Sequence, residues 1–399
     1  MKPPSILHIV MALASILTMA PIIWLYYWPA GGGLDVTGHQ LGGDFINIWA
    51  GPRLAFAGRL NVLTDFPAYH QAISELFGQP IPFHNWGAPP FMLILLWPFA
   101  QAPYFVALGF WTVLTMAAYL LVTMSVVDRD RRLQGLLLLM LSPATLINVI
   151  GGQNGFLTAS LCLGGFLALE RRPRLAGVLF GLLTVKPHLG LVIPLVLLRT
   201  GAWRAIIIAG TVIAFLVAVS AATFGLEMWR GFLLITSAYQ TKLLVVFEGF
   251  YTFMMGSVFS AVRTFGGGVH LAMIVQIGVA ILVAIATMVA YGRTKNQILR
   301  VQLIASATFL ITPYVFIYDM TWTSAVAVWR LLAAGEGARS VPLLYILVWL
   351  GPGYIFQTSF FGLGLAPLFT GAMFLAALRD IHQERGRFHQ ATGNDLSDD

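Results

Sequence analysis

Long apolar runs separated by short basic links make up most of the chain. Runs with few charges predict membrane-spanning helices, because a helix of about 20 apolar residues crosses the hydrocarbon core of a bilayer. They lie at about residues 6–28, 103–127, 133–150, 155–170, 174–185, 187–199, 205–224, 269–291, 298–313, 320–334, 341–357 and 363–379. The pattern therefore predicts an all-α, polytopic membrane protein with about twelve transmembrane segments.

Two longer polar stretches, at about 29–102 and 225–268, interrupt this pattern. Most of the 23 Lys and Arg residues fall in the short links on the opposite side of the predicted membrane. Cytoplasmic loops carry an excess of Lys and Arg, so we expect both termini in the cytoplasm and the two long loops, with helices of their own, on the outer face. The apolar run from Pro89 to Ala100 is too short to span and is expected to be interfacial or re-entrant.

One region is compatible with two topologies. The stretch from Leu175 to Leu198 could be one helix kinked at Pro187, or two short segments that meet at Lys186-Pro187-His188. A single helix would move every later basic cluster to the outer face, so the excess of basic residues in cytoplasmic loops favours two segments. Residues 1–380 are then expected to form one membrane domain, and residues 381–399 a disordered cytoplasmic tail.

Composition excludes a soluble globular protein. Hydrophobic residues make up 58% of the chain and charged residues 10%, and the mean hydropathy is +0.82. The net charge of +7 comes from scattered links of the kind that orient membrane proteins, so nucleic acid is not an expected partner. The single cysteine excludes an intramolecular disulfide, and the histidines show no paired ligand spacing, so we expect neither a metal nor a cofactor.

The most informative polar residue is Asp44, which follows Gly42 and Gly43 in the first long polar stretch. A carboxylate at a membrane surface can act as a general base that takes the proton from an attacking hydroxyl. The alternative is that Asp44 only caps the helix that follows it. Asp44 is therefore the candidate catalytic residue.

The segment after Asp44 is amphipathic when it is counted as a helix. Phe45, Trp49 and Phe56 fall in an aromatic stripe that we expect to enter lipid. Asn47 falls on the side that also carries Asp44, which makes Asn47 a candidate substrate-binding residue.

Lys186 and His188 are the candidate ligands for the phosphate of a lipid-linked donor. A rise of about 1.5 Å per residue from Arg172 places Lys186 several ångströms short of the outer surface. A lysine at that depth needs a water-filled pocket or an anionic partner, unless it extends its side chain to the interface. For His188, an ordinary non-catalytic histidine is the alternative.

Further polar residues lie at the outer ends of other predicted segments. Gln153 and Asn154 could bind sugar hydroxyls, although their glycine-rich surroundings also fit a tight turn. Tyr318 and Asp319 are candidate substrate-binding residues, with helix capping as the alternative for Asp319. His84 faces the same compartment; an ordinary interfacial histidine is the favoured interpretation, and contact with substrate is the alternative.

Four stretches follow one another along the chain in a recognisable order. They are Gly43-Asp44-Phe45 through Ala57-Gly58; Gly152-Gln153-Asn154-Gly155-Phe156-Leu157-Thr158-Ala159; Arg171-Arg172-Pro173 to Leu183 with Lys186-Pro187-His188; and Pro313-Tyr314 with Tyr318-Asp319. Together they resemble glycosyltransferase family 87, a bacterial set of GT-C membrane mannosyltransferases and related enzymes. The resemblance extends from about Asp44 to Asp319.

The resemblance implies a GT-C fold and a polyprenyl-phosphate sugar donor. It implies transfer of a hexosyl group, with mannosyl the first expectation, to an envelope glycolipid or glycan on the outer face of the plasma membrane, with inversion. It does not imply dependence on a metal. The loop aspartate of the family corresponds to Asp44, which would be the base. The family often has an aromatic residue and a polar pair where this chain has Asn47-Ile48-Trp49, so the sugar is not transferred from the family.

Two other functions fit parts of the sequence. A small-solute transporter is compatible with the broken segment at Lys186, because discontinuous helices often line transport sites. A noncatalytic subunit of an envelope assembly complex is the third possibility. The polar candidates gather at outer ends instead of the membrane midplane, which favours the glycosyltransferase.

Overall fold

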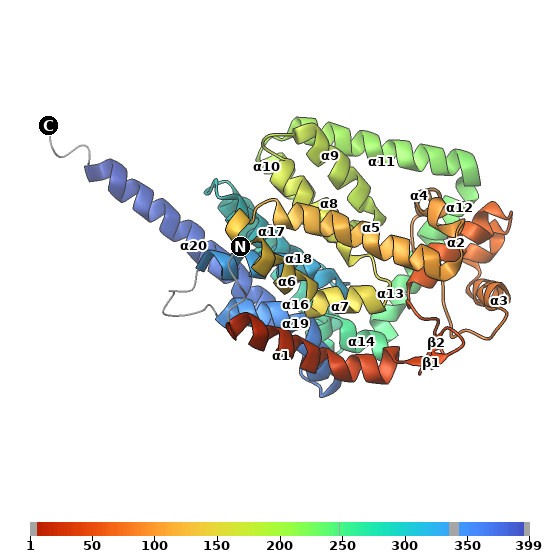
Figure 1. Cartoon of the computed structure of the whole chain (residues 1–399). Helices are drawn as coiled ribbons and strands as arrows, with labels where there is room; N and C mark the ends of the chain where they lie inside the picture. Colours follow the sequence, from red (N-terminus) through yellow and green to blue (C-terminus); the bar gives the residue numbers. More distant parts are fainter. Residues whose placement is uncertain (1–5, 247, 335–342, 395–399) are drawn as a thin grey trace.

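A computed structural model describes residues 6–246, 248–334 and 343–394 of the chain. The described part is helical apart from its loops and one small hairpin, which confirms the predicted all-α class. Five helices are long and apolar enough to cross a membrane (Figure 1). They are α1 (Ile6–Ile22), which a π-helical turn extends to Tyr27, α5 (Tyr104–Met124), α11 (Trp203–Phe224), α16 (Val269–Tyr291) and α19 (Leu343–Phe360).

The other predicted segments are shorter helices. They are α6 (Arg132–Met140), α7 (Pro143–Ile150), α8 (Gly155–Ala168), α9 (Pro173–Leu182), α10 (Val192–Arg199), α17 (Gln297–Ile311), α18 (Thr321–Ala334) and α20 (Ala366–Asn394). The count of about twelve transmembrane segments is not confirmed. Most of these helices extend only about 12–22 Å, less than the hydrocarbon core of about 30 Å. The segments containing α6 and α7 form a pair bent by 53°, which could count as a sixth span.

The helix breaks at Lys186, where both predicted topologies place an interruption. Helix α9 ends at Leu182, and two short 3₁₀ turns (Leu183–Val185 and Pro187–Gly190) lead into α10. Lys186 lies between the turns in a non-helical conformation, because a proline that follows a residue disfavours helix at that residue. Lys186 therefore belongs to neither α9 nor α10. Its side chain can turn toward other elements.

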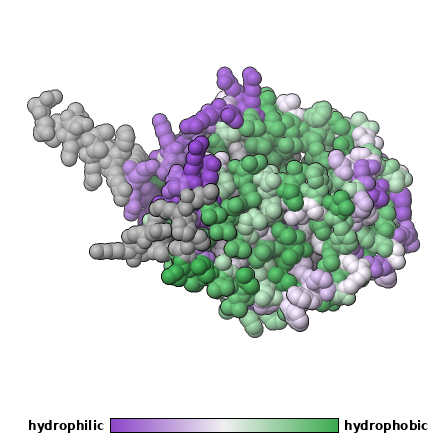
Figure 2. Space-filling view, in the orientation of Figure 1, coloured by the Kyte–Doolittle hydropathy of each residue, from purple (hydrophilic) through white to green (hydrophobic). Residues whose placement is uncertain are grey.

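The two long polar stretches contain short helices of their own. The first holds a hairpin of β1 (Pro29–Gly31) and β2 (Leu34–Asp35), then α2 (Phe45–Phe56), α3 (Phe66–Phe77) and α4 (Phe91–Ala100); the second holds α12 (Leu226–Gly231), α13 (Ser237–Val246), α14 (Phe250–Met254) and α15 (Val258–Thr264). The hairpin, α2, α3 and α12 gather at one end of the molecule, on the right of Figure 1. Figure 2 shows a broad hydrophobic band between two hydrophilic ends, as expected for a protein that crosses a membrane.

Buried apolar side chains form two clusters. The larger cluster is built on α8, α17, α18 and α19, and the smaller one packs α2 and α3 against α4 and the start of α5. At the other end of the molecule, α20 continues to Asn394, where a disordered tail was expected from residue 381. A helix that has already formed gains one hydrogen bond with each added residue, so α20 can extend beyond its packed part.

Candidate active site

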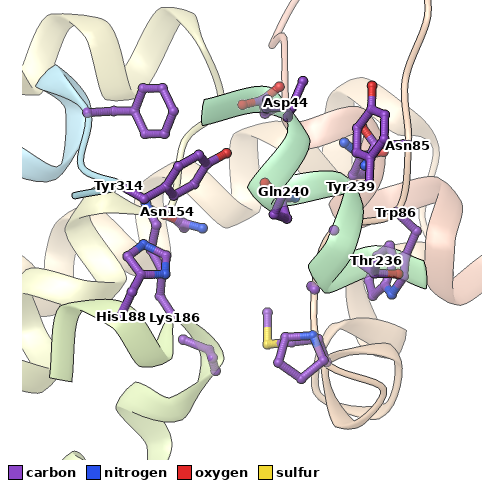
Figure 3. Close-up of a pocket in the computed structure, with 18 of the residues that line it drawn as sticks. Asp44, Asn85, Trp86, Asn154, Lys186, His188, Thr236, Tyr239, Gln240 and Tyr314 are labelled. Carbon is purple, nitrogen blue, oxygen red and sulfur yellow. Dashed lines mark hydrogen bonds between the residues drawn. The ribbon is translucent and has the colours of Figure 1, made fainter. Parts of the chain in front are cut away.

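A cavity of about 470 Å³ lies where the two clusters meet (Figure 3). Trp86 and Trp111 of the smaller cluster and Phe316 of the larger cluster line it. All the site residues predicted from the sequence except Asp319 also line it: Asp44, Asn47, Gln153, Asn154, Lys186, His188 and Tyr318. The fold therefore brings together residues that the sequence spreads over more than half of the chain.

Two glycine-rich turns hold Asp44 beside Gln153. The backbone N–H of Asp44 donates to the carbonyl of Gly151 at 3.2 Å. Gly152 has a positive φ of 55°, and a Cβ there would lie 2.2 Å from the Gly42 carbonyl oxygen. Only glycine allows both the backbone conformation and this close approach of the two turns.

Substituting Gly152 therefore tests whether the two turns meet. We expect Gly152→Ala to lower the melting temperature of the purified protein clearly, since it adds a backbone clash to a conformational cost of about 1–2 kcal/mol. Gly58→Ala is the matched control, because Gly58 also has a positive φ, of 79°, but open space around its Cβ position. Equal losses in the two variants would contradict the close approach.

The Asp44 carboxylate does not cap the helix that it precedes. Asp44 occupies the N-cap position of α2 but makes no capping hydrogen bond. Its Oδ2 accepts a hydrogen bond from Nε2 of Gln153 at 2.9 Å, across 109 residues of sequence. The side chain is half-buried and lines the cavity, so the carboxylate is held in place and accessible from the cavity.

The aromatic stripe of α2 mostly enters protein, and the prediction that it enters lipid is wrong. Phe45 and Trp49 are buried against the start of α5, and the indole N–H of Trp49 donates to the Ala102 carbonyl at 2.9 Å. Only Phe56 at the end of the stripe is exposed. On the opposite side, Asn47 accepts a hydrogen bond from the Tyr69 hydroxyl at 3.0 Å and lines the cavity.

Lys186 is buried and paired with a carboxylate. Its Nζ lies 2.5 Å from Oδ1 of Asp319 and 3.4 Å from Oδ1 of Asn154, and above the Tyr318 ring at 4.5 Å. The lysine side chain is 9% exposed, so it does not extend to the membrane surface. The anionic partner required by its depth is thus Asp319.

Asp319 is fully buried and does not line the cavity, which argues against the predicted direct contact with substrate. Its second oxygen, Oδ2, accepts from the backbone N–H of Phe316 at 3.2 Å. The carboxylate thereby joins the turn before α18 to the break before α10. We assign it to positioning Lys186 instead of binding sugar.

His188 lines the cavity next to the edge of Tyr314, with ring centroids 5.4 Å apart. Its backbone carbonyl accepts from the Thr312 hydroxyl at 2.9 Å, while its Nε2 has no hydrogen-bond partner among the described residues. His84 lies outside the cavity lining, and burial lowers its pKa although the Asp44 carboxylate opposes the shift. His84 is therefore expected to be neutral at pH 7.

Comparison with known proteins matches residues 86–313 to the model of glycosyltransferase family 87, which covers more than half of the chain. The chain belongs to glycosyltransferase family 87. No match was found among curated proteins or among solved structures. The expected resemblance reaches beyond both ends of the matched region, since Asp44 precedes it and Tyr318 follows it.

The cavity of this family 87 glycosyltransferase has a second wall that sequence reasoning missed. Trp86, Thr236 and Gln240 line it, and each has a buried polar atom with no partner among the described residues: Trp86 Nε1, Thr236 Oγ1 and Gln240 Oε1. Figure 3 shows Trp86 and Thr236 across the cavity from Lys186 and His188. Buried polar groups normally have partners, so these atoms indicate a polar ligand.

Proposed function

We propose that this glycosyltransferase moves a hexosyl group, with mannosyl the first expectation, from a polyprenyl-phosphate donor to an envelope glycolipid or glycan. Asp44 is the proposed general base. The observation that carries the proposal is that Asp44 and Lys186 line one cavity in a membrane protein of glycosyltransferase family 87.

The proposed reaction is a single displacement. The acceptor hydroxyl oxygen attacks the anomeric carbon and forms the new glycosidic bond, while the bond from that carbon to the phosphate oxygen breaks. The hydroxyl proton passes to the Asp44 carboxylate, and the bonding electrons leave with polyprenyl phosphate. Asp44 suits this role because its side chain lines the cavity and Gln153 holds one of its carboxylate oxygens, Oδ2, by a hydrogen bond.

Lys186 and His188 are the proposed contacts of the donor phosphate. Two N–H groups of the Lys186 ammonium point to Asp319 and Asn154, and an ammonium has three. The third can donate to a phosphate oxygen, in a site where Asp319 keeps the lysine fixed. The unpartnered Nε2 of His188 offers a second hydrogen bond when it carries the proton.

The opposite wall is proposed to bind sugar hydroxyls. Trp86 lies against Gly51 of α2, where a Cβ would approach its ring to 2.3 Å, so its indole is held in a fixed place. Its N–H can donate, and the side-chain oxygen of Gln240 can accept. On the first wall, Gln153, Asn154 and Tyr318 are the other proposed substrate contacts, together with Asn47.

Trp86→Phe tests this sugar-binding wall. The variant keeps most of the apolar packing but removes the N–H, so we expect KM for a sugar substrate to rise by about 3–10-fold, as for one lost hydrogen bond. Trp24→Phe is the control, because Trp24 is exposed on the membrane-facing surface of α1's extension. An unchanged KM for both donor and acceptor in Trp86→Phe would exclude a contact of the indole N–H with substrate.

The location of the reaction is also a proposal. The excess of Lys and Arg in the links opposite the cavity supports a cytoplasmic position for both termini and an outer position for the cavity. We propose the plasma membrane of a bacterium and a single transmembrane domain over residues 1–380. Membrane lipid, the polyprenyl-phosphate donor and the glycan or glycolipid acceptor are the proposed partners.

The donor class can be tested with the purified full chain. A panel of polyprenyl-phosphate sugars is offered together with envelope glycolipids, and consumption of each donor is followed by chromatography. We expect one hexosyl donor, polyprenyl-phosphate mannose first, to be consumed. Consumption of a soluble nucleotide sugar instead, with every lipid-linked donor unused, would overturn the proposal.

A further inference from the structure

A second cavity, of about 720 Å³, lies at the end of the molecule opposite the candidate active site. Helix α8 begins beside Asn154, which lines the active-site cavity, and ends beside the second cavity. Its 14 residues separate the two cavities by about 21 Å. The ends of α9, α10, α11, α16 and α17 close around it. The charged and aromatic side chains that line it are Glu170, Arg199, Trp203, Arg204, Tyr291 and Arg300.

Three arginines, each from the end of a different helix, line this cavity, and only one carboxylate among the described lining residues offsets their charge. Arg300 pairs with Glu170, and its guanidinium lies 4.8 Å from the centre of the Tyr291 ring. Arg199 and Arg204 are exposed, and neither forms an ion pair with a carboxylate in the described part of the chain. The cavity therefore carries a net positive charge that no described residue balances.

The rim of the cavity is apolar on the side that continues along α10 and α11. Trp203 is 60% exposed at the start of α11, in the kind of position that tryptophan favours at the boundary between lipid head groups and acyl chains. Leu198 on α10 and Ile207, one turn further along α11, are also exposed. A ligand that fits this surface has an anionic head and apolar chains.

We propose that this cavity binds an anionic phospholipid, with its phosphodiester between Arg199 and Arg204 and its acyl chains along Leu198 and Ile207. Guanidinium groups bind phosphate oxygens in pairs of parallel hydrogen bonds, and basic pockets between transmembrane helices are suited to acidic head groups. Membrane orientation alone requires only basic residues near this face. It does not require arginines from separate helices around one cavity with an exposed tryptophan at its rim.

The test uses the purified full chain in a neutral detergent. Binding of phosphatidylglycerol and of phosphatidylcholine is measured by native mass spectrometry, for the wild type and for the double variant Arg199→Gln/Arg204→Gln. We expect the wild type to prefer phosphatidylglycerol, and the variant to bind it about 25-fold more weakly, at roughly a fivefold loss for each arginine. Phosphatidylcholine binding should stay the same in both proteins.

A second double variant, Arg129→Gln/Arg132→Gln, is the matched control. These arginines are exposed at the same end of the molecule, outside the cavity, and their removal changes the net charge equally. An equal loss of phosphatidylglycerol binding in the control would overturn the proposal, because it would show a general charge effect. Competition by millimolar inorganic phosphate as strong as that by the lipid would also overturn it, since the ligand would then be a soluble anion.

Discussion

Asp44→Asn is expected to slow sugar transfer by about 100-fold or more, because an amide cannot take the proton of the acceptor hydroxyl. Asparagine has the same shape as aspartate and can still accept the hydrogen bond from Gln153. Expression and melting temperature should therefore stay close to those of the wild type. The measurement is kcat with saturating polyprenyl-phosphate donor and acceptor.

Asp65→Asn is the control for this variant. Asp65 lies in the same long polar stretch, and its side chain caps α3 by accepting from the backbone N–H of Ala68 at 3.1 Å, a role that asparagine also fills. Its kcat should be unchanged. A kcat for Asp44→Asn within a few-fold of the wild-type value would exclude Asp44 as the general base and leave it a structural residue between two turns.

The second large effect is expected at the buried ion pair of Lys186 and Asp319. Lys186→Met leaves a buried carboxylate without its partner, which typically costs about 3–5 kcal/mol of folding free energy. Adding Asp319→Asn removes that charge and should restore most of the lost stability. Sugar transfer should stay low in the double variant, because the proposed phosphate contact is missing.

Melting temperature and the KM for the donor separate the two roles of Lys186. Recovery of both the melting temperature and the donor KM in the double variant would show that Lys186 is only structural. If the melting temperature of the double variant does not recover, the stability lost in Lys186→Met does not come from the unpaired Asp319 carboxylate. Asp319→Asn alone keeps the hydrogen-bonding shape, and we expect it to lower activity less than Lys186→Met does.

The positions of most helices could be predicted from the sequence, because each apolar run falls on a helix. The number of transmembrane segments could not, since apolar content does not show which short helices cross the bilayer. The aromatic stripe of α2 shows the same limit. Amphipathicity identified an apolar face, but it does not distinguish burial in lipid from burial against α4 and α5.

The polar members of the site could be predicted one by one, while their contacts could not. The depth of Lys186 predicts either a water-filled pocket or an anionic partner, but not which residue the partner is: Asp319 lies 133 residues away, and the sequence indicates a substrate contact for it. The second wall, with Trp86 and Gln240, could not be predicted from the sequence around these residues. Trp86 has no charged neighbour in the sequence, and α13, which carries Gln240, lies in a stretch that the sequence predicts to be a polar loop. Only the packing of Trp86 against Gly51 places it in the cavity.

The proposed reaction is a single displacement that uses one carboxylate, that of Asp44. Among the described residues that line the cavity, Asp44 is the one acid, so no second carboxylate is at hand to form a covalent sugar intermediate. The direct measurement is the anomeric configuration of the product, by NMR, after wild-type transfer from a donor of known configuration. A single displacement gives inversion of the anomeric carbon, and a product with retained configuration would rule it out.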